Sequence, residues 1–185
     1  MKRVIVKSVY DAFEYVMQHY YPAGLEEFAE KSDTYAIISI QDTHTKGFGF
    51  TFSEKQFCKG VLNLYFDDIV KEVEGAVLFD EEMAEKIIAF IEEHKKAETL
   101  LVHCYGGQSR SRAVGAFAVK MLGGDNFRYF KTGVPCIDIV NITLHFFLKD
   151  VRSMLPPALF MLWRMPYLLI ALRYNSLVYC VPLSL

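Results

Sequence analysis

The sequence predicts an α/β fold, with a central, mostly parallel sheet flanked by helices. Short apolar runs rich in β-branched residues alternate along the chain with segments whose apolar residues recur at helical spacing. Strands separated by helices favour a parallel sheet, because each helix carries the chain back to the edge where the next strand begins. The length of 185 residues suits one compact domain, and a hydrophobic fraction of 52% supplies its core. We expect this domain over residues 1–152.

Four strands are predicted from short apolar runs that are bounded by polar residues or turn signals. These runs are residues 4–6, 35–40, 61–66 and 100–103. The run 35–40 precedes the polar segment QDTHTKG, which fits a buried strand that leads into a loop. The run 61–66 ends directly before Asp67 and Asp68, so two carboxylates are expected at the end of a strand.

Three helices are predicted from apolar residues at helical spacing and from residues that favour helix ends. The first begins after Ser8, which together with Asp11 three positions later is typical of a capped helix start. Asp80 is expected to cap the second helix, whose apolar positions form one stripe. The third covers residues 111–122 and is expected to end at Gly123 with a left-handed residue.

Charge and cysteine content restrict the classes of function. The formal net charge of -2 provides no broad basic field, so nucleic acid is not an expected partner. The cysteines lie far apart without a CxxC pair, at positions 58, 104, 136 and 180. The N-terminus turns polar within a few residues, unlike a secretory signal. We therefore expect free thiols in a reducing, cytoplasmic setting.

The segment 153–185 differs in composition from the rest of the chain. It contains no Asp, Glu or Lys, and Arg164 and Arg173 are its only charged side chains. These arginines and four prolines interrupt every apolar run before it reaches the roughly 18 residues that a membrane span needs. Three interpretations remain open: packed terminal helices, a tail that contacts a membrane surface or a protein partner, and out-of-frame coding.

The segment from His103 to Ser111 lies between a predicted strand and a predicted helix. In that position a loop presents its backbone N–H groups to an anion at the N-terminus of the helix. Five residues separate Cys104 from Arg110, which is enough for the chain to curl once around a tetrahedral dianion. Gly106 and Gly107 permit the positive φ values that such a curl needs. The segment is thus predicted to bind phosphate.

Each side chain of this loop has an expected role. The helix dipole, the inward amides and Arg110 favour the thiolate of Cys104, which makes this residue the candidate nucleophile. Arg110 is placed to hold two phosphoryl oxygens bidentately. Ser111 is expected to donate a hydrogen bond to the leaving thiolate, and Ser109 to shape the loop. The candidate phosphate-binding residues are Tyr105, Gly106, Gly107, Gln108, Ser109 and Arg110.

The segment HCYGGQSRS matches HCxxGxxR[S/T], the signature of the protein tyrosine phosphatase superfamily, and its GxSRS ending resembles the dual-specificity branch. The resemblance spans roughly residues 1–150. It implies hydrolysis of a phosphorylated protein through a phosphocysteine intermediate, with an aspartate on a separate loop as general acid. The family pattern favours Asp68 as this acid and leaves Asp67 as the alternative. It also implies that His103 is a buried, supporting residue whose hydrogen bonds position the loop.

The resemblance further implies a substrate class. Phosphoinositide phosphatases resemble a pattern with lysines inside the loop, and this loop has none. We therefore expect a phosphotyrosyl protein or peptide as substrate, with phosphoserine and phosphothreonine left open, and neither a metal nor a cofactor. The remaining histidines do not show metal-ligand spacing. The alternative function is a catalytically inert phosphate-binding or scaffolding module.

Overall fold

The structure is a computed structural model that describes residues 1–22, 33–45 and 47–153. The chain divides into two units, Met1–Phe147 and Leu148–Leu185, and the first unit contains all of the strands given below. Within the described ranges, no helix combines the length and the apolar character that crossing a membrane requires. Apart from Ser153, the apolar segment 153–185 lies outside the described residues, so its three interpretations remain predictions.

The described residues form a four-stranded sheet in the order β1-β4-β2-β3. The strands are β1 (Arg3–Ser8), β2 (Tyr35–Gln41), β3 (Cys58–Tyr65) and β4 (Thr99–Cys104). Every neighbouring pair is parallel, which confirms the predicted α/β fold with a parallel sheet. Ser8 pairs in register with Cys104, and Ser39 with His103, so the carboxyl ends of the strands meet at one edge.

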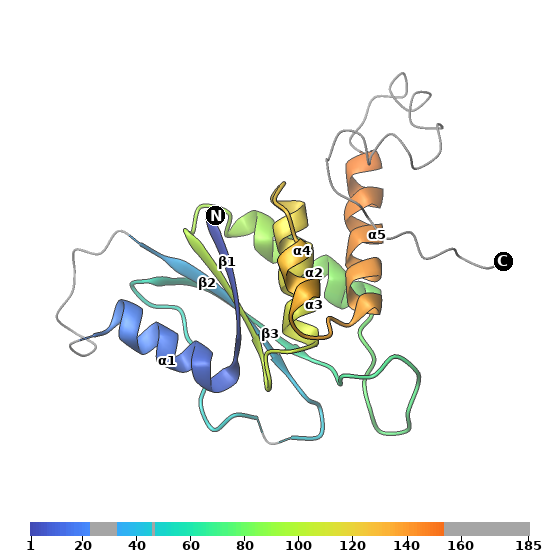
Figure 1. The fold of residues 1–185 in the computed structure, drawn as a ribbon, viewed down its shortest axis with the longest axis horizontal. Helices are drawn as coiled ribbons and strands as arrows, with labels where there is room; N and C mark the ends of the chain where they lie inside the picture. The colour runs from blue at the N-terminus through green and yellow to red at the C-terminus, as the bar shows by residue number, and fades with distance from the viewer. Residues whose placement is uncertain (23–32, 46, 154–185) are drawn as a thin grey trace. The chain divides into compact units, whose positions relative to one another are not determined.

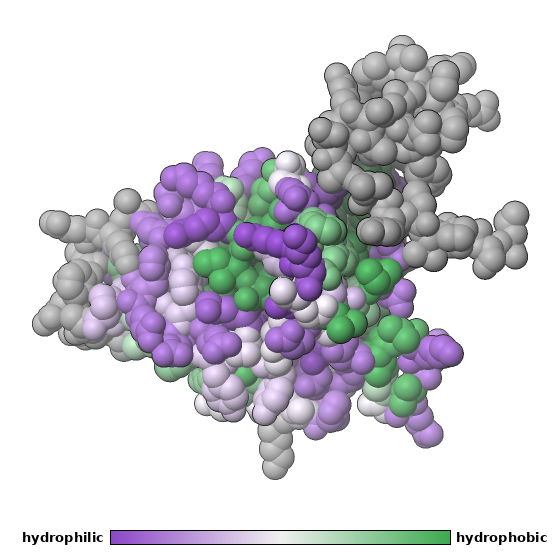
Figure 2. Space-filling model, in the orientation of Figure 1, coloured by the Kyte–Doolittle hydropathy of each residue, from purple (hydrophilic) through white to green (hydrophobic). Residues whose placement is uncertain are grey.

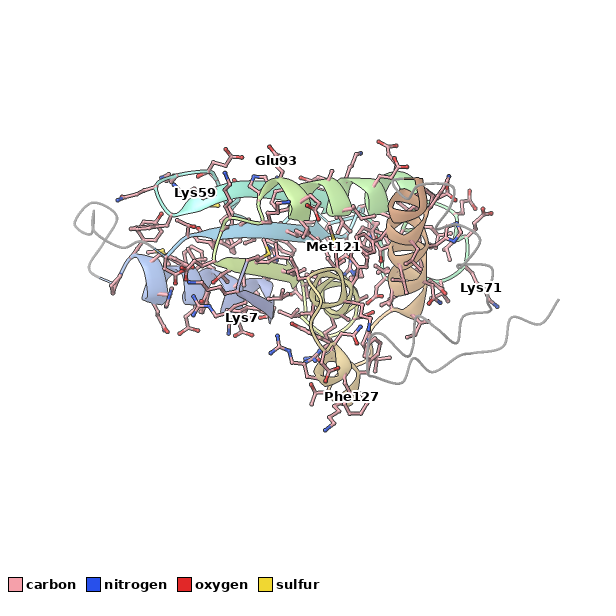
Figure 3. The ribbon with its side chains drawn as sticks, turned by 90° about the horizontal axis from the view of Figure 1, so that it is seen from above. Lys7, Lys59, Lys71, Glu93, Met121 and Phe127 are labelled. Atoms are coloured by element: carbon pink, nitrogen blue, oxygen red, sulfur yellow. The ribbon has the colours of Figure 1, made fainter. Side chains whose placement is uncertain are left out.

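Helices cover both faces of this sheet (Figure 1). They are α1 (Val9–Tyr20), α2 (Glu81–Glu93), α3 (Arg110–Met121), α4 (Phe127–Lys131) and α5 (Ile137–Ser153). The apolar side of α1 packs with Ile37 and Leu101 on one face. The cluster on the other face joins α2, α3 and the start of α5 to Ile38, Leu100 and Val102. In Figure 3, Lys7 of β1 and Lys59 of β3 mark the two edges of the sheet.

The helix ends follow the local sequence signals. The Ser8 side chain accepts a hydrogen bond from the backbone N–H of Asp11 at 3.2 Å, and Asp80 accepts one from Met83 at 2.8 Å. Each bond satisfies an N–H group that the first turn of a helix leaves without a partner. After α3, Gly123 has a φ of 80°, the left-handed conformation that commonly ends a helix. All three predicted helix ends are therefore confirmed.

The segment 66–79 follows β3 and leaves apolar side chains partly exposed. Figure 2 shows apolar residues along this segment and near the start of α5. Ile69, Leu78 and Phe79 line a hollow of about 200 Å³ together with Ile139 and Ile142 of α5. The segment and the start of α5 thus lie side by side at this hollow.

Candidate active site

The candidate active site lies at the carboxyl edge of the sheet, where β4 runs into α3. Cys104 is the last residue of β4 and is 3% exposed. The backbone N–H of Val9, at the start of α1, donates to the carbonyl oxygen of Tyr105 at 3.2 Å. The loop that follows Cys104 is therefore held by the β1–α1 junction as well as by its own strand and helix.

Gly107 is the residue of this loop that requires glycine. Its φ is 71°, and a Cβ atom there would lie 2.6 Å from the backbone nitrogen of Ser8 and 2.7 Å from the carbonyl carbon of Lys7. Its own N–H donates to the sulfur of Cys104 at 3.3 Å. Gly106 does not have a positive φ, so the expectation for the two glycines holds for Gly107 alone.

The sulfur of Cys104 has a second polar neighbour in the first turn of α3. The Oγ of Ser111 lies 3.1 Å from this sulfur, within hydrogen-bond distance. Both side chains are buried, so little water competes for the contact. An amide N–H and a hydroxyl both suit a negatively charged sulfur, because each can donate a hydrogen bond to it.

The guanidinium of Arg110 is buried and oriented through one of its nitrogens. Nη1 donates to the carbonyl oxygen of Phe66 at 2.7 Å and contacts Oδ1 of Asp42 at 2.6 Å. Nε is buried without a hydrogen-bond partner among the described residues, and its nearest carboxylate oxygen, on Asp68, is 3.9 Å away. A buried donor without a partner is costly, so the Nε side of the guanidinium is poised for an acceptor that the protein does not supply.

Asp68 lies beside Ser109 and Arg110 of the signature segment. Its Oδ1 accepts a hydrogen bond from the Ser109 hydroxyl at 2.7 Å, and 42% of its side chain is exposed. The carboxylate thus contacts solvent on one side and the signature segment on the other. Ser109 is the residue that joins the carboxylate to this segment.

Asp67 is adjacent in sequence but has a different environment. Its carboxylate is 4% exposed and accepts hydrogen bonds from the N–H and the hydroxyl of Thr43, from the ring of His44 and from the N–H of Val77. Burial by itself would raise the pKa of Asp67, but these hydrogen bonds to the charged form outweigh it and lower the pKa to about 2. Asp67 therefore ties the segment after β3 to the segment after β2.

His103 is fully buried beneath the loop, as the resemblance implies. Its ring centroid lies 5.5 Å from that of Phe48 and 5.4 Å from that of Phe52. Among the described residues, neither ring nitrogen has a partner within ordinary hydrogen-bond geometry, so the expected positioning hydrogen bonds remain a prediction. Burial lowers the pKa of His103 to about 4, so the ring is neutral near pH 7.

The other residues of the segment differ in exposure. Tyr105, Gly106 and Gln108 are exposed, whereas Gly107 is buried. The carbonyl oxygen of Gln108 accepts a hydrogen bond from the N–H of Val134 at 3.2 Å, which fixes the far end of the loop. Among the described residues, the structure shows no cluster of three His, Cys, Asp or Glu side chains that could hold a metal ion.

The structure brings together residues from three segments, and one of these residues was not predicted. Cys104, Ser109, Arg110 and Ser111 come from the signature segment, and Asp68 comes from the loop after β3. Asp42 contacts Arg110 from the loop after β2 and was missed. A signal was present, because Asp42 lies two residues after the predicted strand 35–40 and the carboxyl ends of parallel strands meet at one edge.

Comparisons with known proteins identify similar solved structures. No protein-family model matches the chain, and no curated protein is a significant match. A human tyrosine phosphatase-like serine/threonine/tyrosine-interacting protein is 18% identical, with a TM-score of 0.44, over 64% of this chain and 79% of that one. Tk-PTP in its active form is 16% identical, with a TM-score of 0.46, over 84% of this chain and 94% of that one.

A third similar structure is PTPMT1 in complex with PI(5)P, which is 13% identical, with a TM-score of 0.48, over 82% of this chain and 94% of that one. The similarity is one of fold. A protein named as tyrosine phosphatase-like is thus among the solved structures to which this chain is similar.

Proposed function

We propose that the chain is a cysteine-dependent protein phosphatase that hydrolyses phosphotyrosine through a phosphocysteine intermediate. One observation carries this proposal: a buried sulfur that contacts two hydrogen-bond donors lies on the same loop as a buried guanidinium with an unsatisfied nitrogen. A sulfur in such surroundings is suited to be a nucleophile, and an unsatisfied guanidinium nitrogen is suited to an anion.

The phosphoryl group would bind in the curl of the loop. Arg110 has Nη1 occupied by Asp42 and Phe66, so the edge formed by Nε and Nη2 remains for two phosphoryl oxygens. Bidentate binding at this edge would satisfy the buried Nε and hold the oxygens as their charge redistributes in the transition state. The N-terminus of α3 and the backbone amides of the loop would add further stabilisation.

In the first step, the thiolate of Cys104 attacks phosphorus while the bond to the leaving oxygen breaks. The carboxylic acid of Asp68 donates its proton to that oxygen, and the phosphoryl group is left on sulfur. The exposed position of Asp68 beside the loop supports this role. Asp67 is the weaker candidate, because both of its oxygens already accept hydrogen bonds within the protein.

In the second step, water attacks the phosphocysteine and the sulfur leaves as a thiolate. The carboxylate of Asp68 accepts the proton of the attacking water, which restores the acid for the next turnover. The hydroxyl of Ser111 is 3.1 Å from the sulfur, where it can donate to the departing thiolate. The balance of protons requires neither a metal nor a cofactor.

The substrate proposal rests on charge and on the surroundings of the loop. Arg110 is the one cation within the segment His103–Arg110, which suits a single phosphomonoester better than a headgroup with several phosphates. Tyr105 and its aromatic neighbours favour an aromatic leaving group. Phosphoserine and phosphothreonine peptides belong in the same assay, because these two features do not exclude them.

The test is phosphate release by the purified protein, with reductant and without added metal, from an aryl phosphate and from peptides that carry phosphotyrosine, phosphoserine or phosphothreonine. Cys104→Ser should abolish release and still bind the phosphotyrosyl peptide. Cys136→Ser is the matched control, because Cys136 is a free, partly buried thiol outside the loop, and it should keep wild-type activity.

Folded wild-type protein that releases phosphate from none of these substrates would contradict the enzyme proposal. Binding of the phosphotyrosyl peptide without release would instead favour an inert phosphate-binding module. Loss of release in both cysteine variants would mean that Cys104 is not specifically required. Circular dichroism of each variant shows whether a loss of activity reflects a loss of fold.

A further inference from the structure

Aromatic side chains, three of them exposed and two half-buried, lie near the loop that follows Cys104. We call this set the aromatic rim, and it consists of Tyr10, Phe13, Phe48, Phe50 and Tyr105. The rings form two groups: the ring centroid of Tyr105 lies 6.4 Å from that of Tyr10 and 6.2 Å from that of Phe48, and the ring centroid of Phe13 lies 4.9 Å from that of Phe50. In Figure 1, the segment after β2 that carries Phe48 and Phe50 runs past the first turn of α1.

The rim is built on the same support as the candidate active site. Phe48 contacts the ring of His103, and Phe50 connects to that ring through Phe52. His103 is the residue before the candidate nucleophile, and Tyr105 is the residue after it. The rim and the loop that follows Cys104 therefore share one buried support, the ring of His103.

Three side chains of the rim are largely exposed to solvent. Tyr10 is 63% exposed, Tyr105 is 57% exposed and Phe13 is 44% exposed. Contiguous exposed apolar surface of this kind marks interaction sites, and aromatic side chains supply much of the binding energy at such sites because they lose little conformational entropy. We therefore expect the rim to bind a ligand or a partner.

The position of the rim identifies the occupant. When a phosphorylated residue places its phosphate in the loop, the neighbouring residues of its chain lie within about 3.5–7 Å along the peptide. Tyr105 belongs to the loop itself, so these neighbours pass over the rim. We propose that the aromatic rim binds an apolar side chain one or two positions from the phosphorylated residue, which makes the enzyme selective for phosphopeptides with such a side chain.

The charged residues near the rim favour a peptide side chain over a membrane surface as its occupant. Asp11 and Glu14 are exposed on α1 beside Tyr10 and Phe13. Carboxylates next to apolar side chains oppose binding to the anionic lipids that attract peripheral proteins, which use Lys and Arg for that purpose. They do not oppose binding of an apolar peptide side chain. The proposal rests on the proposed function, since it assumes that the loop binds the phosphate of a peptide.

The test compares two sets of phosphotyrosyl peptides, one with Leu and one with Ser at the positions before and after the phosphotyrosine. The quantity measured is the ratio of kcat/KM for the Leu and Ser peptides. Burial of a Leu side chain on the rim should give the wild type a ratio of roughly ten or more. Tyr10→Ser and Phe13→Ser should each reduce this ratio at least threefold.

Phe127→Ser is the matched control, because Phe127 is 50% exposed on α4, outside the rim, and this variant should keep the wild-type ratio. A ratio near one in the wild type overturns the proposal. A ratio of kcat/KM that stays at the wild-type value in both Tyr10→Ser and Phe13→Ser also overturns the proposal. Tyr10 and Phe13 lie on an exposed face of α1, so a folded protein is expected in at least one of the two variants, and thermal unfolding checks this.

A binding measurement separates failure of the rim from failure of the enzyme proposal. The Cys104→Ser protein is titrated with the same labelled peptides, and tighter binding of the Leu peptides would support the rim even if the wild type released no phosphate. Equal affinities for the Leu and Ser peptides, or no binding of either peptide, would overturn the proposal that the rim binds an apolar side chain. Sedimentation with phosphatidylserine vesicles tests the other occupant: vesicle binding that Phe13→Ser abolishes would replace the peptide with a membrane.

Discussion

Asp67 and Asp68 show how strongly the environment of one residue depends on contacts that are remote in sequence. The pattern Phe-Asp-Asp after a strand predicts two carboxylates at the sheet edge and does not distinguish their surroundings. The distinction comes from Thr43, His44 and Val77, whose donors converge on Asp67 and leave Asp68 beside Ser109. The family pattern favoured Asp68 as the general acid, and that assignment remains a prediction.

Substitution of Asp67 should lower the stability of the fold, whereas substitution of Asp68 should slow phosphate release. Asp67→Ala leaves several donors without a partner and should lower the free energy of unfolding by roughly 3 kcal/mol. Asp68→Asn removes an exposed carboxyl group and should change that free energy by less than about 0.5 kcal/mol. It should slow phosphate release most for aryl phosphates with poor leaving groups, because these depend most on a proton donor.

Urea unfolding of both variants and release rates across a series of aryl phosphates check this prediction. Equal rates for the wild type and Asp68→Asn with every leaving group would contradict the assignment and transfer the role of acid to Asp67 or to another group. A stability of Asp67→Ala equal to that of the wild type would contradict the anchoring role of Asp67.

At the scale of elements, the sequence predicts those helix ends that depend on contacts between residues close together in the chain. Ser8, Asp80 and Gly123 mark helix ends through contacts within a few residues, and the structure places helix ends at all three. The segment after β2 was predicted only as a polar loop. Its phenylalanines acquire their role by packing on His103 and on α1, and contacts at that separation leave no periodic signal in the sequence.

The contact between the phosphate-binding loop and the β1–α1 junction is another such long-range feature, and it makes a prediction. Gly107→Ala would force a Cβ atom against the backbone of Lys7 and Ser8 at a φ of 71°. We expect a loss of about 2–4 kcal/mol in the free energy of unfolding, because the neighbouring atoms belong to the backbone and cannot move aside cheaply.

Gly106→Ala is the control, since an added Cβ at Gly106 meets no atom within 4 Å. Its effect on the free energy of unfolding should stay below about 0.5 kcal/mol. Urea unfolding measures both variants under the same conditions. Equal stabilities of the two variants would show that the loop can move away from the β1–α1 junction at little cost.

At the scale of the whole molecule, the strand order explains why the site could be predicted only in part. The order β1-β4-β2-β3 places β4 between two neighbours, so its carboxyl end meets residues from segments far apart in sequence. Strand propensity identifies each strand but not its neighbours. The signature segment was predictable because it is contiguous, whereas the contact of Asp42 with Arg110 depends on the strand order.

Burial of His103 in this interior strand should make the stability of the whole domain depend on pH. The pKa of His103 is about 4 in the folded protein and about 6.5 in the unfolded chain. Between these values the unfolded chain binds the proton and the folded protein does not, so the free energy of unfolding falls as the pH falls from about 6.5 to about 4. Asp67, with a pKa of about 2, keeps its contribution above pH 4 and does not add to this change.

The measurement is urea unfolding at several pH values between 4.5 and 7.5, for the wild type and for His103→Gln. The wild type should lose up to about 3 kcal/mol more across this range than the variant, which lacks the titrating ring. The difference between the two proteins removes the contributions of the other histidines, which both share. The same pH dependence in both proteins would show that His103 becomes protonated without unfolding, and that the interior strand tolerates a charge beneath the phosphate-binding loop.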